Sequence, residues 1–194
     1  MKRVNGFKSE APMSAYPMLP AGAYVAVIKN VKVDGDEPDQ QLVLRLEIIE
    51  GEWAGYYTKR YEHDTQNAGG GAKYKAKYKG DYRIQIPDER NTKRIHPEWD
   101  LRTLNNSIWC IEASNPGFHW DGEHEMDLKG KIVGINVRGG VYNMNPYTAI
   151  GRLEAADDVR NGVVKPMKPR EDTANRPGGG QDGFTMVENE ELPF

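Results

Sequence analysis

Two neighbouring segments near the start of the chain alternate apolar and polar residues. In residues 23–34 the apolar positions assigned to one face are Val25, Val27, Val31 and Val33, interrupted only by Lys29. In residues 41–50 they are Leu42, Leu44, Leu46 and Ile48. Alternation with a period of two is typical of strands that bury one face. We therefore predict two antiparallel strands, joined by a turn in the polar residues 34–39.

A third strand is predicted at Tyr56–Tyr61, after a turn in residues 51–55. A loop ending in three glycines follows, and then an extended excursion over residues 73–83 that alternates lysine with tyrosine and carries a local charge of +4. The glycines precede a lysine but not the adjacent Gly-Lys-Ser/Thr of a phosphate-binding loop, so we interpret them as a flexible loop.

A helix is predicted over residues 97–113. Pro97 suits the first turn, and residues 115–117, Asn-Pro-Gly, end the pattern. The apolar residues at helical spacing are Leu101, Leu104, Ile108 and Ile111. Residues 131–138 and 147–155 alternate again and give two more strands, with a loop predicted between them at 139–146.

The predicted order is three strands, an excursion, a helix and two strands. This is the layout of an OB-fold, an all-β barrel of five strands with one helix between strands 3 and 4. A small β-sandwich remains the alternative. We predict an extended lead-in at residues 1–22, the barrel at 23–163, and a disordered linker with an acidic tip at 164–194, where prolines and glycines replace apolar residues.

Composition limits the setting of the protein. No apolar run approaches the length of a membrane span, and the first 22 residues lack the apolar core of a secretion signal. The single cysteine, Cys110, cannot form an internal disulfide and is expected to pack as a small apolar residue. We expect a soluble protein of the cytoplasm, in a bacterial host if the gene is carried by a phage.

The net charge of −3 conceals an uneven distribution. Residues 171–194 hold six acids and one base, which leaves residues 1–170 with a charge of +2. A weakly basic body with an acidic end is compatible with a polyanion bound by one part and a protein by the other, although solvated surfaces give similar totals.

Basic residues and aromatic rings lie together in the third predicted strand and the excursion. Single-stranded nucleic acid needs cations along its phosphates and flat rings against its unpaired bases. The candidate DNA-binding residues are Tyr57, Lys59, Arg60, Tyr61, Lys73, Tyr74, Lys75, Lys77, Tyr78, Lys79, Tyr82 and Arg83, with Tyr142 from the later loop. The competing interpretation is that the tyrosines fill the ends of the barrel and the lysines form a solvated face.

Catalytic and metal-binding patterns are weak. The run from His119 to Glu125 contains His119 and His124, but its spacing matches none of the usual zinc motifs and it reads as a polar turn. His63 and Asp64 could act as a base and its orienting acid, yet no nucleophile motif accompanies them. We predict no enzymatic activity, no cofactor and no metal.

The end of the chain has a more specific pattern. Acids are followed by Leu-Pro-Phe after a Gly/Pro-rich stretch, and this arrangement resembles the tail of the single-stranded DNA-binding (SSB) proteins of bacteria and their phages. In that family the terminal phenylalanine docks on replication and repair proteins. The resemblance implies a partner-binding tip made of Glu188, Glu190, Glu191, Leu192, Pro193 and Phe194.

The body resembles a phage-encoded group of SSB proteins over about 140 residues. The similar segments are residues 19–24, the end of the second strand at 50–55, and Gly130-Lys131 before a later strand. The resemblance implies a protein that binds single strands without strong sequence preference during DNA replication, recombination and repair. One departure is the acidic first hairpin loop, which would repel phosphate. The alternatives are a structural or adaptor protein that binds other proteins and, third, a metal-dependent nuclease or hydrolase.

Overall fold

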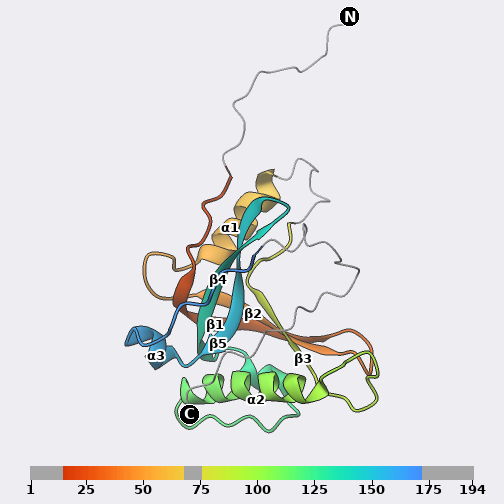
Figure 1. Ribbon diagram of the computed structural model, residues 1–194. Helices are drawn as coiled ribbons and strands as arrows, with labels where there is room; N and C mark the ends of the chain where they lie inside the picture. The colour runs from red at the N-terminus through yellow and green to blue at the C-terminus, as the bar shows by residue number, and fades with distance from the viewer. Residues whose placement is uncertain (1–14, 68–75, 172–194) are drawn as a thin grey trace, which may run out of the picture.

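Five antiparallel strands form one sheet in the computed structural model, which describes residues 15–67 and 76–171 (Figure 1). The strands are β1 (Gly22–Asp34), β2 (Gln41–Ile48), β3 (Asp81–Gln85), β4 (Ile132–Tyr142) and β5 (Asn145–Glu154). The helices are α1 (Tyr56–Asn67), α2 (Pro97–Ala113), α3 (Ala156–Arg160) and the 3₁₀ helix η2 (Glu125–Leu128).

The strands lie in the order β3-β2-β1-β4-β5. The first three form a meander, and β4 returns after α2 to pair with the other side of β1, which is the order of a Greek key. No hydrogen-bonded pairing joins β3 to β5 within the part of the chain that the structure describes. The prediction of a mostly-β fold is therefore confirmed, whereas the predicted OB-fold barrel is not.

The core lies on one face of the curved sheet. Leu42, Leu44, Leu46 and Ile48 of β2 are all buried there, as predicted. From β4 the core receives Val133, Ile135 and Val137, and Cys110 of α2 packs against them as a small apolar residue. Burial raises the pKa of the Cys110 thiol to about 11, so the group is neutral at physiological pH.

A β-bulge at Lys29 corrects the predicted face of β1. Ile28 pairs with Leu46 and Asn30 with the next residue of β2, so Lys29 is one residue too many. An extra residue inverts the alternation of side chains beyond it. Ala26 and Ile28 face the core before the bulge and Val31 after it, so Val25 and Val27 lie on the opposite face from Val31.

The third predicted strand, Tyr56–Tyr61, is instead the start of the helix α1. Tyrosine and threonine favour strands, but the decisive contact comes from Glu47 on β2. Its buried carboxylate accepts the backbone N–H groups of Tyr57 (3.0 Å) and Thr58 (2.8 Å), as well as the hydroxyl of Thr58. A carboxylate at this place satisfies donors that a helix start leaves without partners. The third strand of the sheet is β3, which begins in the last residues of the predicted excursion and extends two residues beyond it.

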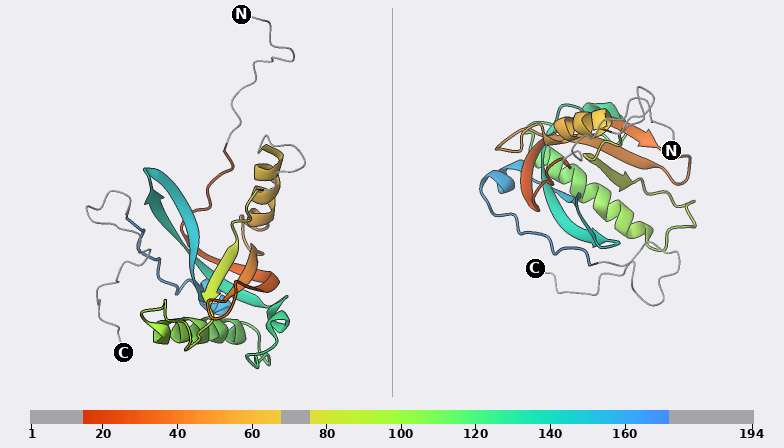
Figure 2. Two further views of the ribbon diagram at one scale, coloured as in Figure 1. Left: turned by 90° about the vertical axis from the view of Figure 1, so that its right-hand side faces the viewer. Right: turned by 90° about the horizontal axis from the view of Figure 1, so that it is seen from above.

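Helix α2 has the predicted bounds. Its buried side is marked by Ile111, Cys110 and the carboxylate of Asp100, which receives a bidentate ion pair from Arg94. Leu101, predicted to face the core, is half exposed because it lies one residue away from that side. The helix packs across β3, β4 and β5 at one end of the sheet (Figures 1 and 2).

Chain segments at both ends of the domain add to the sheet. Leu19, in the predicted lead-in, is buried in the core, and its backbone N–H donates to the hydroxyl of Tyr56 (2.9 Å). At the other end, the carbonyl of Lys165 accepts a hydrogen bond from Asn136 of β4 (3.0 Å). The predicted domain boundaries at residues 22 and 163 therefore lie within segments that pack on the sheet.

Candidate nucleic-acid interface

The β4–β5 hairpin extends past its last pairing with β1 and ends in a two-residue turn. Tyr142 pairs with Asn145, and Asn143 and Met144 between them have φ of 49° and 62°. Two consecutive positive φ angles are typical of the type I′ turn, whose twist matches that of a hairpin. The loop predicted at 139–146 is therefore wrong, because these residues continue both strands. Tyr142 lies near the tip with 61% of its surface exposed.

Residues 163–171 return alongside β4 and bring Arg170 to this hairpin. The backbone N–H of Arg170 donates to the carbonyl of Gly139 (2.9 Å), and its carbonyl accepts the N–H of Val141 (3.2 Å). Arg138 lies on β4 two residues before Gly140, the residue that Arg170 bridges, and the charge of Arg170 is one of the causes that lower the pKa of Arg138. Two arginines from distant parts of the sequence thus come to the same segment of β4.

Two glycines make room for the side chains around this arginine pair. A Cβ at Gly140 would lie 2.7 Å from the ring of Tyr147, and a Cβ at Gly151 would lie 3.4 Å from the side chain of Arg138 and 2.5 Å from the sulfur of Met167. The Tyr147 ring and the stem of Arg138 therefore lie directly on the backbone of the hairpin. Close packing of this kind fixes the direction of long side chains.

The arginine pair has no anionic partner in the described ranges. No ion pair joins Arg138 or Arg170 to a carboxylate of residues 15–67 or 76–171. Burial and then the nearby charge of Arg170 lower the pKa of the Arg138 guanidinium. Both causes disfavour the cation, so an anion bound beside it would be stabilised.

A second group of basic residues lies before β3. Lys77 and Lys79 are exposed and flank Tyr78, whose side chain points the other way. The Tyr78 hydroxyl donates to the carboxylate of Glu47 (3.2 Å), and the guanidinium of Arg45 lies 4.7 Å from the centre of its ring. Burial raises the pKa of Tyr78. The two lysines are therefore available to a ligand, while the tyrosine between them supports the fold.

Three other predicted tyrosines also lie against the protein. Tyr57 is 4% exposed, so its predicted stacking role is corrected to packing in the core. The ring of Tyr61 packs on that of Tyr78, with centroids 5.9 Å apart. Tyr82 packs against the core, and burial raises its pKa.

The remaining basic residues that were predicted to bind DNA, and that the structure describes, have partners within the protein. Lys59 donates to a backbone carbonyl in the turn before α1 (3.1 Å). Arg60 donates to the hydroxyl of Tyr56 (2.9 Å), and Arg83 to the carboxylate of Asp34 (2.8 Å). Arg83 thus neutralises part of the acidic first hairpin loop.

Some predicted residues lie outside the ranges that the structure describes. From the excursion these are Lys73, Tyr74 and Lys75, and from the predicted partner-binding tip Glu188, Glu190, Glu191, Leu192, Pro193 and Phe194.

Histidines and acids near residue 121 form local turn contacts. Asp121, His124 and Asp127 are exposed and lie close enough to share an ion. The Asp121 carboxylate already accepts the backbone N–H groups of Glu123 (2.8 Å) and His124 (3.0 Å), which lower its pKa. This arrangement is that of a polar turn, which was the interpretation from sequence.

Arg138, Arg170 and Tyr147 were missed by the sequence analysis. The sequence did contain a signal for Arg138 and Tyr147, because residues 132–153 include no aspartate or glutamate. Nothing in the sequence indicated that Arg170, from the predicted linker, lies beside the hairpin.

The chain was also compared with known proteins. No model of a protein family matches it, and no curated protein sequence does. Among the described residues, no helix combines the length and the apolar character needed to cross a membrane.

Proposed function

We propose that this protein binds single-stranded DNA without strong sequence preference. The observation that carries the proposal is the pair formed by Arg138 on the β4–β5 hairpin and Arg170 on the segment bridged to it, which has no carboxylate partner in the described ranges and accompanies an exposed tyrosine near the hairpin tip. Cations beside aromatic rings are the combination that binds phosphates and unpaired bases together.

The arrangement of the elements supports a path for the strand. The β4–β5 hairpin and α1 rise as two arms from the same side of the sheet, and α2 lies at the opposite end (Figure 2). We place phosphates at Arg138 and Arg170 on the first arm, and base stacking at Tyr142. Lys77 and Lys79, which follow α1 in the chain, would hold the strand from the other arm.

The strand order supports the further proposal that the sheet is a partly open OB-fold barrel. An OB-fold is a five-stranded Greek-key barrel that need not close fully. The observed order has the Greek-key return of β4 beside β1, and α2 lies between β3 and β4 in the chain. The barrel would then be open between β3 and β5.

The resemblance of the tail to that of SSB proteins supports a cellular role in phage DNA replication, recombination and repair. In this proposal the tip, residues 188–194, recruits partner proteins while the hairpin binds DNA.

A salt titration of the full chain with a fluorescent oligothymidine tests the proposal. We expect single strands to bind at least tenfold more tightly than a duplex of the same length, because a duplex hides the base faces. The logarithm of the affinity should fall linearly with the logarithm of the salt concentration. Equal affinity for the two forms, or binding that does not respond to salt, would overturn it and favour an adaptor protein.

A further inference from the structure

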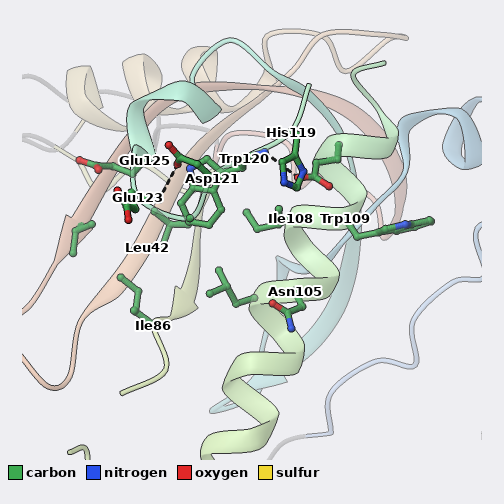
Figure 3. A pocket seen from close by; sticks show the side chains of 14 residues that line it. Leu42, Ile86, Asn105, Ile108, Trp109, His119, Trp120, Asp121, Glu123 and Glu125 are labelled. Carbon is green, nitrogen blue, oxygen red and sulfur yellow. Dashed lines mark hydrogen bonds and ion pairs between the residues drawn. The ribbon is translucent and has the colours of Figure 1, made fainter. Parts of the chain in front are cut away.

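An apolar pocket of about 500 Å³ lies at the α2 end of the molecule, outside the proposed DNA path (Figure 3). One wall is α2, another is formed by the far ends of β1 and β2, and a third is the loop that follows α2. The apolar residues of its floor are Val33, Leu42, Ile86, Leu104, Ile108 and Trp120.

The mouth of this pocket is acidic. Glu112, Asp121, Glu123 and Glu125 line it, together with His119 and the exposed Trp109. No lysine or arginine is among the lining residues. The side chains of Asp121, Glu123 and Glu125 gather on one side of the pocket, across from Ile108 of α2 (Figure 3).

Two of these carboxylates are engaged and two are available. Glu112 accepts hydrogen bonds from the backbone N–H of Trp120 (3.0 Å) and lies 2.8 Å from the imidazole of His119. Glu123 and Glu125 form no ion pair with any residue of the described ranges. An incoming cation would therefore meet two carboxylates that have no ion-pair partner in these ranges.

The pocket lies far from the proposed DNA path. Gly22 begins β1 beside the β4–β5 hairpin, whereas Val33 of the pocket lies eleven residues further along the strand. At about 3.3 Å per residue this is roughly 36 Å of strand. The acids would also repel phosphate, so the ligand of this pocket is not nucleic acid.

We propose that this pocket docks an extended peptide segment of a partner protein, in which lysine or arginine residues flank one bulky apolar residue. The apolar residue would fill the floor, and the flanking cations would lie against Glu123 and Glu125. Apolar anchors in a pocket with charged neighbours at the rim are the usual arrangement at protein interfaces. The site is separate from DNA binding and does not depend on it.

Three capped pentapeptides test the chemistry of the pocket in the full chain. They carry phenylalanine between two pairs of lysines, phenylalanine between two pairs of glutamates, and alanine between two pairs of lysines. Binding is followed by the indole NMR signals of Trp109 and Trp120. We expect saturable binding of the lysine–phenylalanine peptide, at least tenfold weaker binding of the alanine peptide, and none of the glutamate peptide. Equal binding of the three would overturn the proposal.

Matched variants locate the binding. The double variant Glu123→Lys, Glu125→Lys should bind the lysine–phenylalanine peptide at least tenfold more weakly than the parent protein. Glu62→Lys with Asp158→Lys makes the same change of charge at exposed positions that do not line the pocket, and should change the affinity less than twofold. Equal losses in the two double variants would mean that the peptide responds only to net charge, which overturns the proposal.

Two further measurements separate other ligands. Affinity of the Glu123→Lys, Glu125→Lys variant for oligothymidine should not fall, and a fall would mean that the pocket belongs to the DNA site. A peptide with the sequence of residues 1–12, which contains Lys2, Arg3 and Phe7, is the internal candidate. If it binds more tightly than the lysine–phenylalanine peptide, the occupant is the chain's own segment and the proposal of a separate partner is wrong.

Discussion

Two regions of this protein are rich in tyrosine and basic residues, and they use them in opposite ways. Around α1 and the start of β3, Tyr57 and Tyr78 are packed inward, and Arg60 and Arg83 have partners in the protein. On the β4–β5 hairpin, Tyr142 is exposed and Arg138 lacks a carboxylate partner in the described ranges. The sequence makes the first region the better candidate for DNA binding, whereas the contacts favour the second.

The difference teaches that composition identifies where binding residues are abundant, not which are available. A basic side chain that already donates to a carboxylate gains little from binding a phosphate, because it must first lose that partner. A buried aromatic ring has no exposed face on which a nucleobase could stack. In the described ranges Lys59, Lys77 and Lys79 of the first region are exposed and form no ion pair, and of these Lys59 donates to the backbone carbonyl of Ala54.

The largest expected effect concerns the internal role of the first region. Glu47→Ala should lower the free energy of unfolding by about 3 kcal/mol, because it removes the acceptor of the backbone N–H groups of Tyr57 and Thr58 and of the Thr58 hydroxyl. Urea unfolding followed by circular dichroism measures the change. Glu62→Ala, at an exposed position of α1, is the control and should change stability by less than about 0.5 kcal/mol.

A different result would reverse the comparison. If Glu47→Ala leaves stability unchanged but abolishes binding of oligothymidine, the tyrosines that it holds contact DNA directly.

The parts of the fold that the sequence predicts correctly depend on local signals. Helix α2 begins at Pro97 and ends at Ala113, as predicted, because a proline at its first turn and a helix-stopping Asn-Pro-Gly lie next to it in the chain. The buried face of β2 also follows from four alternating residues. Both patterns are complete within one segment.

The parts of the fold that the sequence does not predict depend on contacts between distant segments. The start of α1 is capped by Glu47, ten residues earlier, and Arg170 reaches the hairpin only because residues 163–171 return along β4. The bulge at Lys29 inverts half of β1 without any glycine or proline to mark it. The candidate site was therefore only half predictable: Tyr142 was found, and its arginine neighbours were not.

The second prediction tests the arginine pair on the hairpin. Arg138→Gln with Arg170→Gln should weaken binding of oligothymidine roughly tenfold at moderate salt. If each arginine contacts one phosphate, the slope of log affinity against log salt should fall by about 1.4, since a single strand contributes about 0.7 per contact. Lys93→Gln with Arg102→Gln removes the same charge elsewhere and should change neither quantity by as much.

An unchanged slope in the double arginine variant would assign the phosphate contacts to the first region. Lys77→Ala with Lys79→Ala would then be expected to carry the salt dependence instead.

The third prediction separates stacking from charge on the same hairpin. Tyr142→Ala should weaken binding about fivefold, near the lower end of the roughly 1–3 kcal/mol that a stacked base contributes, and leave the salt slope unchanged. Tyr142→Phe keeps the ring and should bind as the parent does. If the two variants lose affinity equally, the hydroxyl group and not the ring makes the contact.

The smallest expected effect comes from the acidic tip predicted in residues 188–194. Glu188 follows Arg170 by eighteen positions in the sequence, and a flexible chain of that length would span about 23 Å on average. The tip would then reach the arginine pair at an effective concentration in the millimolar range and compete with DNA.

Glu188→Gln, Glu190→Gln and Glu191→Gln together should raise the affinity for oligothymidine two- to threefold at roughly 0.01 M salt, where the Debye length is about 30 Å, and leave it unchanged at roughly 1 M. Removing Phe194 alone leaves those acids in place, so DNA affinity should stay within about twofold while a replication partner is lost from a pull-down with defined proteins. Equal gains from a matched loss of three exposed acids on the body, Glu62→Gln, Glu89→Gln and Glu123→Gln, would show that total charge, and not the acids of the tip in particular, controls the competition.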